Sequence, residues 1–239
     1  VEKVAARANI TLTYTTGGES QDRQRRKKLI AAMAEAVDWY HQRLLNSPDA
    51  RAARDYLRDR GLSGDVARQF QLGYAPDEWD ALSQHLVKKG YAADVLSDVG
   101  LAFTNKANRL QDSFRARIMF PIFSDNGDPV AFGGRILPGS TDPAKYKNSS
   151  ETKIYFKSKT LYGLNWAKND VVKADQVIVC EGYTDVIACH AAVSQHSALA
   201  GQGFLQWHRE KHLAEAKEAS EAVAQAIEVQ KDFFALRHK

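Results

Sequence analysis

The sequence predicts an α/β protein in which a helical amino-terminal region precedes a basic mixed-sheet segment, a short parallel-sheet unit and a helical tail. Apolar residues recur at helical spacing from Leu29 to Leu44, which predicts a long amphipathic helix. Two apolar runs, at 117–123 and 130–137, flank a turn and predict paired strands. A third run, at 177–180, precedes a polar turn and a small-residue helix, as a buried parallel strand does.

Composition limits the class of protein. The 239 residues are 44% hydrophobic and 26% charged, as in an ordinary globular protein. Two cysteines, Cys180 and Cys189, cannot build a disulfide framework or a four-cysteine zinc site, so zinc is not expected. The sequence has no run of about 18 apolar residues and its start does not read as a signal peptide, so we expect no membrane association and a cytoplasmic location. The net charge of +4 permits an anionic partner.

Residues 1–28 are predicted to be a linker followed by a basic segment. The five cations at 23–28 either contact phosphates or form the solvated start of a helix. Residues 29–104 are predicted to be helical, because helical periodicity recurs there between Pro and Gly breaks. The helices expected after the first one span 49–60, 62–71, 79–87 and 94–99.

Residues 105–170 form a basic mixed α/β segment, with ten Lys and Arg against five acidic residues between 105 and 160. Gly133 and Gly134 predict a place where another backbone or a ligand approaches the strand closely. The segment 145–148 mixes cations, an aromatic ring and an amide, which suits phosphates and stacked bases. A half-exposed strand with solvated lysines is an equal alternative for these four residues.

The run at 177–180 ends in Glu181 and Gly182, and Asp185 follows. The carboxyl ends of strands in open α/β sheets are where ligands bind, so Glu181 and Asp185 are predicted to share one metal or proton site. The alternative is that Glu181 caps a helix or lies in a solvated loop. Residues 171–193 would form this unit, and 194–239 a helical tail of unknown role.

The string EGYTDV at 181–186, after an apolar strand, resembles the first motif of the Toprim domain in its primase version. Other blocks resemble the catalytic core of bacterial DnaG-type DNA primases, in the order and spacing of that family. They are FRARIMFPI (114–122), AFGGRIL (131–137), KYKNSSET (145–152), IYFK (154–157) and LYGL (161–164). The resemblance covers roughly residues 1–192, which gives an α+β amino-terminal subdomain followed by a partial Toprim-type α/β sheet and a helical tail.

The resemblance implies a DNA-directed RNA polymerase of the primase type, a nucleotidyltransferase that makes short RNA primers on single-stranded DNA for replication. The implied partners are the template strand, ribonucleoside triphosphates and, through a domain missing here, the replicative helicase. Glu181 would bind Mg²⁺ or Mn²⁺ and carry the chemistry together with Asp185. The implied residues of the template and nucleotide groove are Arg115, Arg117, Arg135, Lys145, Asn148 and Lys157.

The resemblance stops after about Ala192. The family continues with an Asp-x-Asp pair that supplies the main metal ligands, and the sequence after Glu181 contains no such pair. We therefore expect this chain, apparently truncated after the first Toprim motif, to be inactive by itself. The alternatives are a catalytically incomplete module that binds single-stranded nucleic acid, or a Toprim-type nuclease.

Overall fold

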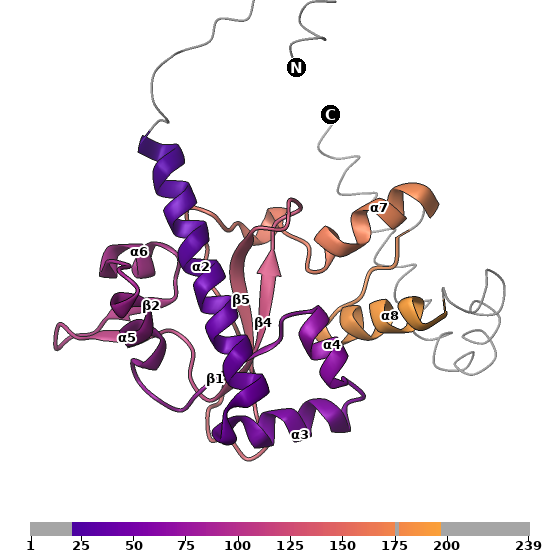
Figure 1. Ribbon diagram of the computed structural model, residues 1–239, viewed down its shortest axis with the longest axis horizontal. Helices are drawn as coiled ribbons and strands as arrows, with labels where there is room; N and C mark the ends of the chain where they lie inside the picture. Colours follow the sequence, from indigo (N-terminus) through magenta and orange to yellow (C-terminus); the bar gives the residue numbers. More distant parts are fainter. Residues whose placement is uncertain (1–20, 175–176, 197–239) are drawn as a thin grey trace, which may run out of the picture. The chain divides into compact units, whose positions relative to one another are not determined.

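The computed structural model describes residues 21–174 and 177–196 (Figure 1). Its longest helix is α2 (Gln21–Asn46), which buries a stripe of side chains that includes Leu29, Met33 and Tyr40. The predicted helix is thus confirmed, and it begins at Gln21. The basic cluster at 23–28 lies in its first turns, as the solvated alternative requires. Within that cluster, Arg25 forms ion pairs with two carboxylates of a neighbouring helix.

Four shorter helical segments follow α2 and agree with the predicted helices to within a few residues. They are the 3₁₀ turn η1 (Pro48–Ala50) leading into α3 (Arg51–Asp59), then α4 (Gly64–Gln69), α5 (Ala81–Lys88) and α6 (Ala93–Asp98). Helices α3, α5 and α6 each end shortly before a glycine, and α4 ends shortly before Gln71, whose φ is positive. Three short strands in or beside this region have no counterpart among the predictions: β1 (Gly73–Ala75), β2 (Ala102–Thr104) and β3 (Leu110–Asp112).

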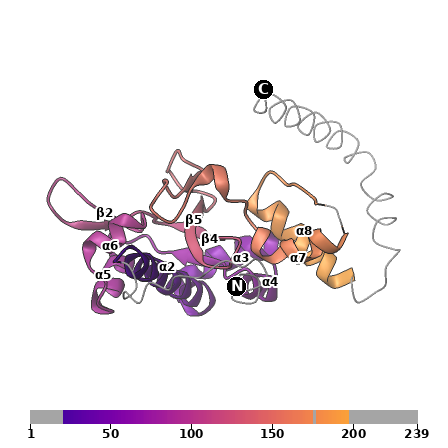
Figure 2. The same ribbon diagram turned by 90° about the horizontal axis from the view of Figure 1, so that it is seen from above.

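The central sheet is antiparallel and has the strand order β1-β4-β5-β6. Strands β4 (Arg117–Phe123) and β5 (Pro129–Ile136) confirm the two predicted strands and the turn between them. Strand β6 (Tyr146–Asn148) shows that most of the segment 145–148 is extended, which is compatible with both interpretations of these residues. Figures 1 and 2 show α2 running along one face of this sheet.

Helix α2 approaches the sheet closely because β1 carries a glycine at the contact. A Cβ atom on Gly73 would lie 2.6 Å from the Cβ of Tyr40. The same tyrosine ring meets Phe132 of β5 edge to face, with 5.4 Å between ring centroids. Residues of α2, α5, α6, β4 and β5 form one hydrophobic core around these contacts.

The pairing register assigns the side chains of the sheet to two faces, because successive residues of a strand point to opposite sides. Met119 pairs with Gly134 and lies on the face that α2 covers, which we call the α2 face. Phe120 pairs with Gly133 and lies on the opposite face, where Tyr183 stacks on it. We call this second surface the Tyr183 face.

A buried carboxylate joins the hairpin of β2 and β3 to helix α5. Asp112, at the end of β3, accepts hydrogen bonds from the backbone N–H groups of Leu82 and Ser83 at 2.8 and 2.9 Å, and from the Ser83 hydroxyl. The side chain of Asp80, the residue before the helix, makes no capping hydrogen bond. Asp112 therefore caps α5 from a remote strand, and burial raises the pKa of its carboxyl group.

The prediction of a strand at 177–180 is wrong. These residues have no regular secondary structure, and Val177, Ile178 and Val179 are 64–70% exposed. A strand needs a neighbour to satisfy its backbone groups, and within residues 21–174 and 177–196 this run pairs with none. The predicted helix after the turn is confirmed as α8 (Tyr183–His196), and α7 (Leu164–Ala174) precedes the run.

Most of the predicted linker, residues 1–20, and most of the predicted tail, residues 197–239, lie outside the described residues. The compact unit that contains the sheet ends at Tyr183, so α8 is described by itself. No helix in the described ranges is both long enough and apolar enough to cross a membrane.

Candidate nucleic-acid interface

Arg135 is a buried cation on the Tyr183 face of the sheet. The pairing of β5 with β6 sets it opposite Tyr146, and its Nε donates a hydrogen bond to the Tyr146 hydroxyl oxygen at 3.0 Å. Its guanidinium carbon lies 4.4 Å from the ring centre of Tyr56, which belongs to α3. Arg135 is only 6% exposed, and its Nη1, which is itself buried from solvent, has no hydrogen-bond partner among the described residues. The site thus contains a guanidinium cation with one unpaired N–H donor group.

Tyr183 joins the motif at 181–186 to the same face. Its hydroxyl donates a hydrogen bond to Oδ1 of Asn148 at 2.9 Å, and its ring stacks on Phe120 at 5.3 Å with 13° between planes. Burial raises the pKa of Tyr183 to about 12, so the hydroxyl keeps its proton as a donor at neutral pH. The anchor fixes the chain two residues after Glu181.

The two central glycines of β5 make room for side chains. A Cβ atom on Gly133 would lie 2.4 Å from the Tyr183 ring, and one on Gly134 would lie 2.9 Å from the Phe114 ring. The prediction of a close approach here was correct. Its nature differs from what we expected, since aromatic rings fill the space in place of another backbone or a ligand.

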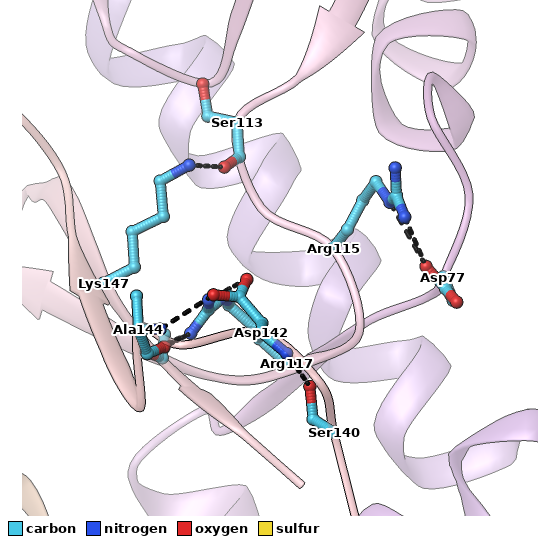
Figure 3. A network of polar contacts seen from close by, with 9 residues as sticks. Asp77, Ser113, Arg115, Arg117, Ser140, Asp142, Ala144 and Lys147 are labelled. Carbon is cyan, nitrogen blue, oxygen red and sulfur yellow. Dashed lines mark hydrogen bonds and ion pairs between the residues drawn. The ribbon is translucent and has the colours of Figure 1, made fainter.

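Arg117 lies on the α2 face and its guanidinium is bound by protein groups (Figure 3). Its Nη2 is 2.6 Å from Oδ2 of Asp142, and its Nη1 donates to the carbonyl oxygen of Ala144 at 2.9 Å. The side chain is 2% exposed. The backbone N–H of Ala144 and the guanidinium together hold the pKa of Asp142 below its usual range, so the pair stays ionised at neutral pH.

Two further cations lie in the view of Figure 3. Lys147 donates from Nζ to the carbonyl oxygen of Ser113 at 2.6 Å, and burial lowers the pKa of its ammonium group. Arg115 is paired with Asp77 at 2.9 Å, and its guanidinium carbon lies 3.4 Å from the ring centre of Trp79. Both cations therefore already have protein partners.

The structure accordingly divides the predicted groove residues. It places Arg135 and Asn148 on the Tyr183 face, and the ring of Tyr146 lies beside the Arg135 guanidinium. It turns Arg117 to the other face, toward Asp142. Lys145 and Lys157 are exposed, and Lys157 begins the short helix η2 (Lys157–Lys159).

The carboxylates predicted for catalysis lie at the start of α8. Glu181 is exposed in the bend before this helix, and Asp185 is an exposed residue of its first turn. No three His, Cys, Asp or Glu side chains in the described ranges gather in a way that could hold a metal ion. The described residues alone therefore do not make the metal site that the resemblance implies.

Sequence reasoning missed Tyr56, which contributes a ring to the site from the helical region. It precedes Arg135 by 79 positions, and no local pattern in α3 distinguishes it from a packing residue. Its ring also lies 5.4 Å from the guanidinium carbon of Arg60. Only its contact with the Arg135 guanidinium in the folded chain identifies it.

Comparison with known proteins gives a consistent set of matches. A family model described as the DNA primase catalytic core, N-terminal domain, matches residues 39–168. The DNA primase of Streptomyces coelicolor is 41% identical over 207 residues, which are 85% of this chain and 32% of that protein. This chain therefore spans about a third of the length of the curated relatives it matches.

Solved structures with the same fold include three that contain DNA. The RNA polymerase domain of the Mycobacterium tuberculosis primase DnaG, in complex with a double-stranded DNA oligomer that has a 6-nucleotide overhang, matches with a TM-score of 0.67 and 40% identity. That match covers 70% of this chain and 51% of the other. A DnaG primase catalytic domain bound to single-stranded DNA matches with a TM-score of 0.64 and 38% identity over 73% of this chain and 54% of that one. The mixed helix and sheet fold predicted from the sequence is the fold of these proteins.

Proposed function

Because the chain belongs to the family of DNA primase catalytic cores, we propose that it is the template- and nucleotide-binding part of an enzyme that makes short RNA primers on single-stranded DNA. The observation that carries this proposal is Arg135. Burying a guanidinium costs several kcal/mol unless an opposite charge compensates it, and within the described residues no carboxylate pairs with Arg135. A phosphate group would supply that charge and accept hydrogen bonds from the guanidinium.

Four of the predicted groove residues suit direct contact with the ligand. Arg135 would bind a phosphate, Asn148 would orient a base or sugar while held by Tyr183, and exposed Lys145 would attract the backbone. Lys157 has the same exposure as Lys145, and we propose the same role for it.

We propose a smaller part for the two arginines that already form ion pairs. Arg117 and Arg115 could bind phosphate only if Asp142 and Asp77 gave up their guanidinium groups. Breaking the pair of Arg117 would also leave a buried cation uncompensated, which is costly. We therefore infer that Arg117 holds the loop at 138–144 against the sheet.

Glu181 would contribute one carboxylate to a divalent metal site that needs further ligands from outside the described residues. Mg²⁺ or Mn²⁺ suits an all-oxygen site, and such an ion, when bound, neutralises charge that develops on a transferred phosphate. The Tyr183 anchor would fix the distance from Glu181 to the groove. We propose that this activity takes place in the cytoplasm, where bacteria replicate their DNA. A contact with the replicative helicase would use parts of a longer protein.

The binding role predicts a salt-dependent affinity for single-stranded DNA. In a titration of a labelled dT oligomer at several salt concentrations, Lys145→Ala should weaken binding and reduce the magnitude of the log–log salt slope by roughly 0.7. Lys106→Ala removes another exposed lysine, from the β2–β3 hairpin turn, and serves as the control. Equal affinities and slopes for both variants would remove Lys145 from the interface.

The catalytic role predicts that this chain makes no detectable primer when supplied with template, ribonucleotides and Mg²⁺ or Mn²⁺. One carboxylate beside the groove cannot hold the ions that nucleotidyl transfer requires. The measurement is the yield of labelled oligoribonucleotide. Robust metal-dependent synthesis, abolished by Glu181→Gln, would show that the chain supplies the remaining ligands itself.

A further inference from the structure

Two buried arginines of the central sheet have opposite kinds of partner. Arg117 is 2% exposed and ion-paired with Asp142, whereas Arg135 is 6% exposed and lies 4.4 Å from the ring of Tyr56. A carboxylate cancels the charge of a guanidinium and occupies its donors. An aromatic ring attracts the cation through its electron-rich face and leaves the N–H groups unused. Arg117 is therefore already neutralised, whereas Arg135 keeps its charge for a ligand.

We propose that Tyr56 is the positioning residue that keeps Arg135 ready to bind phosphate, an inference that rests on the proposed function. The ring of Tyr56 offsets part of the cost of burying the cation without neutralising it. The hydroxyl oxygen of Tyr146 accepts a hydrogen bond from the Nε–H of Arg135, and this bond restricts the orientation of the guanidinium plane. The guanidinium is thus held in one orientation before a ligand binds. Its Nη1 is buried and has no partner in the part of the chain that the structure describes, so a phosphate would reach the cation through the small part of the side chain that is exposed.

This arrangement assigns a function to α3 that its sequence does not suggest. Tyr56 comes from the helical region, and Arg135 and Tyr146 come from neighbouring strands. Because the ring belongs to a separate element, the position of α3 against the sheet decides whether Arg135 is correctly oriented. Pre-ordering of this kind reduces the rotational freedom that the side chain would otherwise lose on binding.

The experiment is a double-mutant cycle that pairs Tyr56→Leu with Arg135→Gln, with affinity measured for two phosphate ligands, ATP and a dT oligomer. Tyr56→Leu keeps an apolar but smaller side chain and removes the ring. It should weaken binding about two- to fivefold, as expected for the loss of one cation–π contact. Tyr56→Phe keeps the ring and should bind within twofold of the parent. In the Arg135→Gln background, Tyr56→Leu should add no further loss.

Several outcomes distinguish the possible failures. If Arg135→Gln binds both ligands like the parent, the proposed phosphate role of the groove is wrong. If Arg135→Gln binds weakly while Tyr56→Leu binds like the parent, only the role of Tyr56 is wrong. An equal loss from Tyr56→Leu in both backgrounds would also overturn it, because that result is general damage to α3. The melting temperature of Tyr56→Leu measures such damage, and Arg58→Ala, an exposed change on the same helix that removes the Arg58–Asp55 ion pair, gives the reference for a change in α3.

Comparing the two ligands shows whether Arg135 binds a phosphate of the nucleotide or of the template strand. A loss confined to ATP would assign Arg135 and Tyr56 to the incoming nucleotide, and a loss confined to the dT oligomer would assign them to the template backbone. Either pattern supports the positioning role, provided that the Tyr56→Phe variant restores the affinity that the Tyr56→Leu variant loses.

Discussion

The Gly133→Ala variant is expected to be less stable by about 1 to 3 kcal/mol and to bind single-stranded DNA more weakly than the parent. The added Cβ would lie 2.4 Å from the ring of Tyr183, closer than packed atoms can approach. Because Tyr183 also donates a hydrogen bond to Asn148 and stacks on Phe120, the ring cannot move without losing both contacts. Urea denaturation gives the loss of stability, and a dT oligomer titration gives the loss of affinity.

Gly64→Ala is the matched control, since its Cβ would meet the Arg68 side chain at an ordinary distance of 3.5 Å. We expect that variant to have parental stability and DNA affinity. A second check removes the obstacle: in a Tyr183→Ala background, Gly133→Ala should cost close to nothing. A full penalty in that background would show that the strand, and not the tyrosine, requires glycine at position 133.

The Asp112→Ala variant is expected to lose about 3 kcal/mol of unfolding free energy, the largest effect of a single substitution that we expect. The change leaves the buried N–H groups of Leu82 and Ser83 without acceptors, and each such group costs about 1 to 3 kcal/mol. It also removes the negative charge from the amino-terminal end of α5, where the helix dipole favours it. Equilibrium urea denaturation measures the difference.

Two milder variants test this account of the cap. Ser83→Ala removes only the hydroxyl donor and should cost about 1 kcal/mol, as for one hydrogen bond. Asp112→Asn keeps one oxygen acceptor, so its stability should fall between those of the parent and Asp112→Ala. If Asp112→Ala proves no less stable than Ser83→Ala, the helix amides do not depend on this carboxylate.

The elements that could be predicted are those whose pattern is local. The stripe from Leu29 to Leu44 repeats over several turns, and the apolar runs at 117–123 and 130–137 are joined by a turn rich in Asp, Asn and Gly. Three-residue strands such as β1 and β2 carry no such repeat. They exist because a neighbouring strand pairs with them, and that neighbour is distant in sequence or separated by a hairpin turn.

The run at 177–180 shows the converse error. Its composition is that of a buried strand, and the structure leaves it exposed and unpaired with any strand in the described ranges. Apolar β-branched residues favour a pleated, covered surface, and such a surface forms only when neighbouring strands pair with the run. The prediction from Glu181 onward was less affected, because a helix satisfies its own backbone groups.

By itself the sequence determined the family, the order of the main elements and the set of cations from which a phosphate site could be drawn. The tertiary structure decided which of these cations are available. Arg117 and Arg135 both lie on central strands, but the register turns them to opposite faces of the sheet. Asp142 neutralises Arg117, whereas the ring of Tyr56 holds Arg135 without neutralising it. The availability of a buried charge depends on the groups that fold against it, and those groups come from distant positions in the chain.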